Sequence, residues 1–202
     1  MALALAGTAS LVLLTFALSW AAGLTGGATH DVGAVDAATR TVTAVLREEP
    51  PQLDSTLATD QISGMVLGHV MEGLLRYDEH GRLAPGVAEG WEQHDLTITF
   101  RLRADARWSD GRLVTAHDFV FAWQTALDPA NASEYAFILF PIRNATAINQ
   151  GRLPVEELGA TAIDDRTLAV QLERPTAYFD KLVAFTTYYP VRRDFYEATA
   201  GR

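Results

Sequence analysis

Side chains that could perform catalysis or bind a metal are scattered along this sequence. The histidines show no spacing typical of metal ligands. They are His30, His69, His80, His94 and His117. The sequence contains no glycine-rich phosphate loop, no Gly-x-Ser-x-Gly turn and no His-Glu-x-x-His motif. We therefore expect no metal site and no cofactor, and the missing motifs weigh against catalysis.

The carboxylates Glu48, Glu49 and Asp54 lie close together in the sequence. Two carboxylates that work as acid and base must face each other across a substrate, and spacing alone does not show this. The His117-Asp118 pair is interpreted as part of the first turn of a helix, where the helix dipole favours an acidic side chain. No nucleophile accompanies this pair, so we predict that the protein is not an enzyme.

Composition narrows the classes of protein further. The chain has 202 residues, of which 49% are hydrophobic, and this is enough to bury a sizeable core. The net charge is -9 and the basic residues are dispersed, which argues against nucleic acid as a partner. Cysteine is absent, so disulfides, thiolate metal sites and a lipid-modified cysteine are excluded.

The amino-terminal segment has the composition of an export signal. Residues from Ala2 to Leu24 carry no charged side chain and are rich in Leu, Ala and Val. Small residues near Ala28 suit a cleavage site, and the apolar run is also long enough to span a bilayer. We predict a signal peptide or membrane anchor over residues 1–28, followed by a flexible linker over 29–40.

The next segment predicts a strand followed by a helix. Residues Thr41–Leu46 are rich in Val and Thr and end at a Pro50-Pro51 breaker. A helix is expected from about Gln61 to Leu75, with Asp60 as its cap. Its buried stripe is expected to consist of Ile62, Val66, Val70 and Leu74.

Local signals predict three further elements. A tight reversal is expected at Asp78–Gly81, where the glycine can adopt positive φ. Apolar residues alternate with polar ones from Leu96 to Arg103, as in a half-buried strand. Thr115 and Asp118 form a capping-box pattern that opens a helix, and this helix stops at Asp128-Pro129.

The second half of the chain predicts a hairpin and a short helix. The hairpin joins Ala160–Ile163 to Leu168–Leu172, and the helix runs from Pro175 to Leu182. Because strands and helices do not alternate regularly, the fold class is predicted as α+β.

Aromatic residues concentrate in this second half. Most of them are expected in the core, but Tyr135 follows a polar stretch from which its ring could cover a ligand. The group consists of Tyr135, Phe137, Phe140, Tyr178, Phe179, Phe185, Tyr188 and Tyr189.

Longer motifs resemble a known family. They are Glu89-Gly-Trp91, Thr97-Ile-Thr-Phe-Arg-Leu-Arg103, Ala106-Arg-Trp-Ser-Asp-Gly111 and Val114-Thr-Ala-His-Asp-Phe-Val-Phe-Ala-Trp123. In the residues of these motifs and in their spacing, the chain resembles the extracellular solute-binding proteins of family 5, which serve ABC importers. The resemblance extends over nearly everything from Thr41 to Val191. It favours the oligopeptide-binding and murein-peptide-binding branch over the nickel and haem binders.

This resemblance implies part of a type II periplasmic-binding-protein clam-shell, in which two lobes close on an extended peptide. Residues 41–71 would supply the first strand and helix of lobe one. Residues 72–190 would form an additional family-specific domain with an antiparallel or mixed sheet, and residues 191–202 would begin the return to lobe one. Family members are far longer, so the chain is expected to be an incomplete fragment.

The resemblance also implies where a ligand binds. Thr59, Asp60, Gln61 and Ile62 match a loop that lines the cleft and offers backbone hydrogen bonds to a peptide. Tyr135 matches an aromatic residue of the additional domain that lies near the ligand. The expected partners are short peptides and the permease subunits of an ABC transporter, and the expected state is a periplasmic or extracellular monomer.

Other functions stay open at this point. The solute could be nickel or another non-peptide ligand, and the chain could be an interaction module that kept only the additional domain. A hydrolase that acts on peptides or cell-wall fragments is the remaining alternative.

Overall fold

The computed structural model describes residues 34–199. The predicted signal or anchor segment and residues 29–33 of the predicted linker lie outside this range. The chain divides into a unit that ends at Arg47 and a second unit that begins at Glu48. Within the described range, no helix combines the length and the apolar character needed to cross a bilayer.

The described part of the first unit contains a short antiparallel hairpin. Strand β1 (Ala34–Asp36) pairs with β2 (Thr41–Thr43). The strand expected over Thr41–Leu46 is therefore shorter than predicted, and part of the expected linker is a strand. The side chains of β2 are exposed, so the Val and Thr residues of this strand pair locally without joining a core.

Helix α2 (Gln61–Val70) begins where the sequence predicted, but it ends five residues before the expected Leu75, which is the first residue of strand β3 (Leu75–Tyr77). Asp60 caps it, because an oxygen of its side chain accepts a hydrogen bond from the Ser63 N–H at 2.8 Å. The expected stripe was wrong, since Val70 is 72% exposed and the buried residues are Ser63 and Leu67. Four-residue spacing identifies a helix but not the face that neighbouring segments cover. In α2 the covered face includes Ser63, whose hydroxyl accepts a hydrogen bond from the Gln52 N–H at 3.2 Å.

The predicted reversal at Asp78–Gly81 is confirmed. It joins β3 (Leu75–Tyr77) to the antiparallel β4 (Leu83–Pro85). The Asp78 carboxylate accepts hydrogen bonds from the backbone N–H groups of His80 and Arg82, both at 2.9 Å. Gly81 has a φ of 71°, a conformation that costs glycine little.

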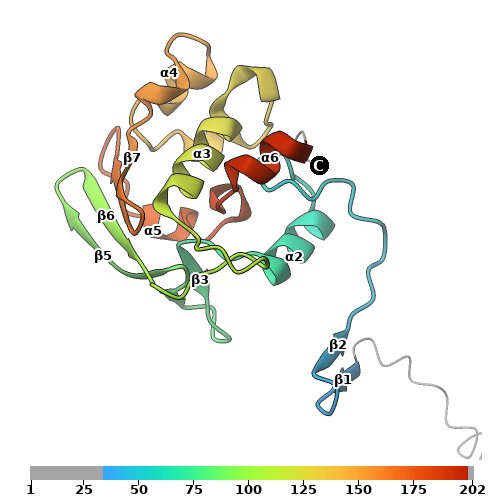
Figure 1. The fold of residues 1–202 in the computed structure, drawn as a ribbon. Helices are drawn as coiled ribbons and strands as arrows, with labels where there is room; N and C mark the ends of the chain where they lie inside the picture. Colours follow the sequence, from blue (N-terminus) through green and yellow to red (C-terminus); the bar gives the residue numbers. More distant parts are fainter. Residues whose placement is uncertain (1–33, 200–202) are drawn as a thin grey trace, which may run out of the picture. The chain divides into compact units, whose positions relative to one another are not determined.

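A sheet with the strand order β5-β6-β8-β7 lies beside helix α3 (Figure 1). The strands are β5 (Ala88–His94), β6 (Thr97–Leu102), β7 (Ala160–Asp164) and β8 (Thr167–Gln171), and each neighbouring pair is antiparallel. The alternation in β6 and the β7–β8 hairpin were predicted correctly. Strand β5 was not predicted, because it is a mostly polar and exposed edge strand without apolar alternation.

Helix α3 (Ala116–Leu127) packs against β7 and β8. The predicted capping box is present, because the Asp118 carboxylate accepts from the Thr115 N–H at 2.8 Å. The helix ends at Leu127 with Asp128 as its C-cap, and Pro129 opens the 3₁₀ helix η1 (Pro129–Asn131). The local signals at both ends therefore fixed this helix to the residue.

The remaining elements are short. They are the 3₁₀ helices η2 (Ala136–Leu139), η3 (Val155–Glu157) and η4 (Thr186–Tyr188), and the helices α4 (Ala145–Asn149), α5 (Phe179–Leu182) and α6 (Arg193–Thr199). Helix α5 begins four residues later than Pro175, after a turn in which the Phe179 N–H donates to the Thr176 carbonyl at 3.1 Å. The mixture of helices with an antiparallel sheet confirms the α+β class.

Candidate functional site

Residues Asp54–Ala58 form a turn that leads into the start of α2. The Asp54 carbonyl accepts from the N–H groups of Leu57 at 3.1 Å and Ala58 at 2.8 Å. One Asp54 carboxylate oxygen accepts from the N–H and the hydroxyl of Thr56, at 2.8 and 2.7 Å. Hydrogen bonds within the turn therefore stabilise it. The turn sets the direction of the chain where it enters α2.

The predicted ligand loop lies directly after this turn. Thr59, Asp60 and Ile62 are half-buried and Gln61 is exposed. Hydrogen bonds from Ser63 lower the pKa of Asp60, which keeps the capping carboxylate ionised. Within residues 34–199, the N–H groups of Thr59 and Gln61 have no acceptor. These backbone donors suit a ligand with carbonyl groups.

Tyr135 lies in an exposed group of three rings, together with Phe137 and Phe185; we call this group the aromatic platform. The Tyr135 and Phe137 rings meet edge to face with centroids 5.8 Å apart. The Tyr135 and Phe185 centroids lie 6.1 Å apart with the rings tilted by 42°. The sequence indicated Tyr135 alone, since Phe137 and Phe185 were expected in the core with most other aromatic residues.

A buried hydrogen bond brings the two predicted parts of the site together. The Ser133 hydroxyl donates to the Thr56 carbonyl at 2.6 Å, across 77 residues of sequence. This bond joins the loop that carries Tyr135 to the turn that precedes Thr59. Helix η4 also contacts both α2 and η2. Sequence reasoning missed Ser133 and Thr56, because short polar residues in a loop carry no signal of a distant partner.

A groove lies elsewhere in the described part of the chain. It has a volume of about 860 Å³. It is bounded by residues 51–55, 108–110 and 190–192, by Val70 and Met71, and by Phe195, Tyr196 and Thr199. None of the five predicted site residues lines it. Asp54 and Ser55 contribute buried oxygens that have no partner in the described residues. No sequence motif indicated this groove.

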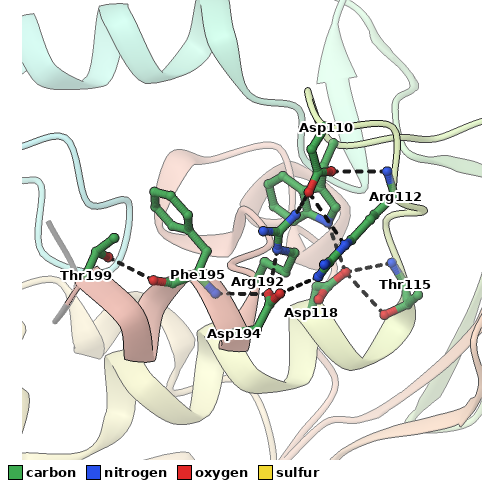
Figure 2. A network of polar contacts seen from close by, with 9 residues as sticks. Asp110, Arg112, Thr115, Asp118, Arg192, Asp194, Phe195 and Thr199 are labelled. Carbon is green, nitrogen blue, oxygen red and sulfur yellow. Dashed lines mark hydrogen bonds and ion pairs between the residues drawn. The ribbon is translucent and has the colours of Figure 1, made fainter.

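One wall of this groove is held by charged side chains (Figure 2). Arg192 bonds to Asp110 and to Asp194, and Arg112 also bonds to Asp194. We call these four residues the arginine–aspartate network. The backbone N–H of Arg112 and the side chain of Arg192 hold the pKa of Asp110 below its ordinary value. The network attaches the start of α6 to the turn at 108–111.

A buried carboxylate lies beside the network. Asp118 also accepts from the Trp108 indole N–H at 3.3 Å, and burial raises its pKa although these bonds oppose the change. Its contacts are those of a helix cap, as the sequence predicted for the His117-Asp118 pair. Within residues 34–199, no group of three or more His, Cys, Asp or Glu side chains could hold a metal ion, and His30 lies outside that range.

Relatives of known name match most of the chain. The oligopeptide-binding protein OppA of Bacillus subtilis is 37% identical over 190 residues, which are 93% of this chain and 35% of that protein. The probable deoxycholate-binding periplasmic protein YgiS of Escherichia coli is 40% identical over 147 residues, which are 71% of this chain and 28% of that protein. The chain thus spans about a third of the length of these relatives.

Solved structures share the fold. The substrate-binding domain of an oligopeptide ABC transporter from Bacillus anthracis is 48% identical, with a TM-score of 0.75 over 77% of this chain and 30% of that chain. Haemophilus influenzae OppA in complex with RPPGFSPFR is 40% identical, with a TM-score of 0.72 over 74% of this chain and 30% of that one. The fold is therefore that of part of a type II periplasmic binding protein.

The model of a protein family completes these comparisons. The description of that family is "Bacterial extracellular solute-binding proteins, family 5 Middle", and its model matches residues 82–201. The match includes the whole four-stranded sheet, α3 and the loop that carries Tyr135. Since it extends over more than half of the sequence, this chain belongs to the bacterial extracellular solute-binding proteins of family 5.

Proposed function

We propose that the complete protein containing this chain binds short peptides outside the membrane and delivers them to the permease of an ABC transporter. The observation that carries the proposal is the pair of backbone donors at Thr59 and Gln61, which the Ser133–Thr56 hydrogen bond joins to the loop of Tyr135. Main-chain hydrogen bonds give affinity for a peptide of any sequence. The similarity to a relative solved with RPPGFSPFR supports the same ligand class.

The domain boundaries expected from the sequence belong to this proposal. Residues 1–28 would direct export or anchor the protein, and 41–71 would contribute to lobe one. Residues 72–190 would form the additional domain, and 191–202 would return to lobe one. The protein would act as a monomer on the periplasmic or extracellular side and would turn over no substrate.

The proposal can be tested at a single backbone N–H group. Gln61 is the first residue of α2, a position at which proline fits a helix. The preceding Asp60 has φ -95° and ψ 157°, an extended conformation that a following proline accepts. Gln61→Pro therefore removes the N–H donor without breaking α2, and Gln61→Ala is the matched control that keeps the donor.

Calorimetry on the complete natural protein, with a mixed set of short peptides, supplies the measurement. We expect Gln61→Pro to weaken peptide binding roughly three- to tenfold, because one neutral hydrogen bond is worth about 0.5–1.5 kcal/mol. Gln61→Ala should bind like the natural protein. If the natural protein and both variants bind peptides with equal affinity, the Gln61 N–H does not contact the ligand. If no peptide releases or absorbs heat on binding to the natural protein, peptide capture is refuted.

A non-peptide solute is the second candidate, because the relative YgiS is described as a probable deoxycholate-binding protein. The same calorimeter should be used with deoxycholate and with nickel. Saturable binding of either compound, without peptide binding, would establish this candidate in place of the first.

A further inference from the structure

Helix α6 lies beside helix α3, which it contacts at Phe121 (Figure 1). The guanidinium of Arg193 lies 4.4 Å from the centroid of the Phe121 ring. The Tyr196 ring meets the same ring edge to face, with centroids 5.5 Å apart. Arg193 and Tyr196 are three residues apart in α6, so they lie on one face of this helix. Both kinds of contact are favourable, and they hold this face of α6 against α3.

The arginine–aspartate network fixes the start of α6 (Figure 2). Arg192 immediately precedes this helix, and its side chain bonds to Asp110 in the turn at 108–111. The Val191 N–H donates to the Asp118 carbonyl at 3.2 Å, which joins the same segment to α3. Because α6 is fixed at its start and held along one face, its later residues keep a defined position.

Tyr196 connects α6 to the turn that precedes the predicted ligand loop. A side-chain hydrogen bond joins Tyr196 to Thr56, which is buried in this turn. The Thr56 hydroxyl already donates to the Asp54 carboxylate at 2.7 Å, so its oxygen is the acceptor for the Tyr196 hydroxyl. Burial raises the pKa of Tyr196, and the charge of Asp54 raises it further. Tyr196 therefore keeps the proton that it donates to Thr56 at neutral pH.

Thr56 is thus held from two sides. Its carbonyl accepts from the Ser133 hydroxyl at 2.6 Å, and its side chain bonds to Tyr196. Thr59 and Gln61 follow Thr56 by three and five residues, so the position of Thr56 sets where their N–H groups lie. Hydrogen bonds weaken steeply when the donor and the acceptor are misaligned. A displacement of this turn would therefore weaken main-chain bonds to a ligand.

We propose that Tyr196 is a positioning residue for the peptide-binding loop, and that it holds the N–H groups of Thr59 and Gln61 where peptide carbonyls can reach them. This inference rests on the proposed function and adds to it a helix, α6, that contains none of the predicted ligand residues. Tyr196 itself acts through Thr56 and does not contact the peptide. Because the loop bonds to the main chain of the ligand, Tyr196 should affect all peptides alike.

The test is calorimetry on the complete natural protein with a mixed set of short peptides. Tyr196→Leu removes the hydroxyl and the ring contact with Phe121, and we expect it to weaken the binding of every peptide by a similar factor, roughly three- to tenfold. Tyr196→Phe keeps the ring and should show a smaller loss. Tyr77→Leu makes the same chemical change in β3 and should bind like the natural protein. Unfolding curves verify that each variant is folded.

A double variant separates positioning from a general loss of stability. If Tyr196 acts by placing the Gln61 N–H, its effect on affinity requires that N–H group. The loss caused by Tyr196→Leu should therefore be smaller when Gln61→Pro has already removed the donor. When Gln61→Ala keeps the donor, Tyr196→Leu should cause its full loss. Two residues that act independently would instead show losses that multiply.

The outcomes distinguish this inference from the proposed function. If no peptide binds to the natural protein, the proposed function fails and the inference falls with it. If peptides bind and Tyr196→Leu leaves their affinity unchanged, the inference alone is overturned. Losses of Tyr196→Leu and Gln61→Pro that multiply would overturn it as well. If Tyr196→Leu weakens only peptides with a particular side chain, Tyr196 contacts the ligand directly, and the inference is wrong.

Discussion

Tyr188 offers the most direct test of how the site is held together. Its side chain is fully buried, and its hydroxyl is the donor to the Ile138 carbonyl. Pro141, three residues after Ile138, has no N–H that could replace this donor in a continued 3₁₀ turn. The substitution Tyr188→Phe therefore deletes one hydroxyl and leaves the carbonyl unsatisfied, while the ring contacts remain.

The expected magnitude follows from these contacts. A buried acceptor that loses its donor costs about 1–3 kcal/mol of the free energy of unfolding. For a protein of this size, each kcal/mol lowers the melting temperature by about 2–4 °C. Tyr188→Ala also loses the edge-to-face contacts with Trp123 and with Phe179, at centroid distances of 5.3 and 5.8 Å. Its cost should be near the values of about 3–5 kcal/mol that large aromatic truncations show.

Urea unfolding followed by tryptophan fluorescence is a suitable assay, because Trp123 touches Tyr188. The matched control is Tyr178→Phe, since Tyr178 is 54% exposed, and its change in the free energy of unfolding should remain within about 0.5 kcal/mol.

Burial raises the pKa of Tyr188, so its hydroxyl stays protonated. A raised acid pKa affects stability only above the unfolded pKa near 10, so the loss in Tyr188→Phe should be the same between about pH 6 and 9. A loss no larger than that of Tyr178→Phe would refute this account of the η2–η4 contact.

Three further predictions use the same assay. Ser133→Ala should cost about 1–3 kcal/mol, because it removes a buried donor; an unchanged midpoint would contradict the proposed connection. Gly86→Ala should cost about 1–3 kcal/mol, since its Cβ would lie 2.5 Å from a backbone oxygen, whereas Gly90→Ala meets nothing within 4 Å and should cost less. The lowered pKa of Asp110 stabilises the fold above its unfolded value near pH 4, and this contribution is lost as pH falls through the folded pKa. Asp110→Asn should therefore flatten the acid dependence of stability, and an unchanged pH profile would show that the arginine–aspartate network does not couple to folding.

Local rules of the chain were sufficient for several parts of the fold. The capping residues Asp60 and Thr115 marked the starts of α2 and α3, because an N-cap bonds to N–H groups two or three residues away. The apolar alternation of β6 and the turn at Asp78–Gly81 likewise depend on neighbouring residues alone. Family motifs then indicated a ligand loop at Thr59–Ile62 and the ring of Tyr135.

Long-range contacts decided what the sequence left open. Whether Val70 or Leu67 faces the core depends on which segment packs on α2. A spacing of four residues does not identify that segment. The exposure of Phe137 depends on the register of η2, and Ser133 acquires its role from a partner 77 residues away. The sequence by itself determined the features that neighbouring residues specify, which are the capped starts of α2 and α3, the reversal at Asp78–Gly81 and the alternation of β6, because caps, turns and alternation are local interactions. Only the tertiary structure decided which faces are buried and which side chains meet, because burial and distant hydrogen bonds depend on residues far apart in the chain.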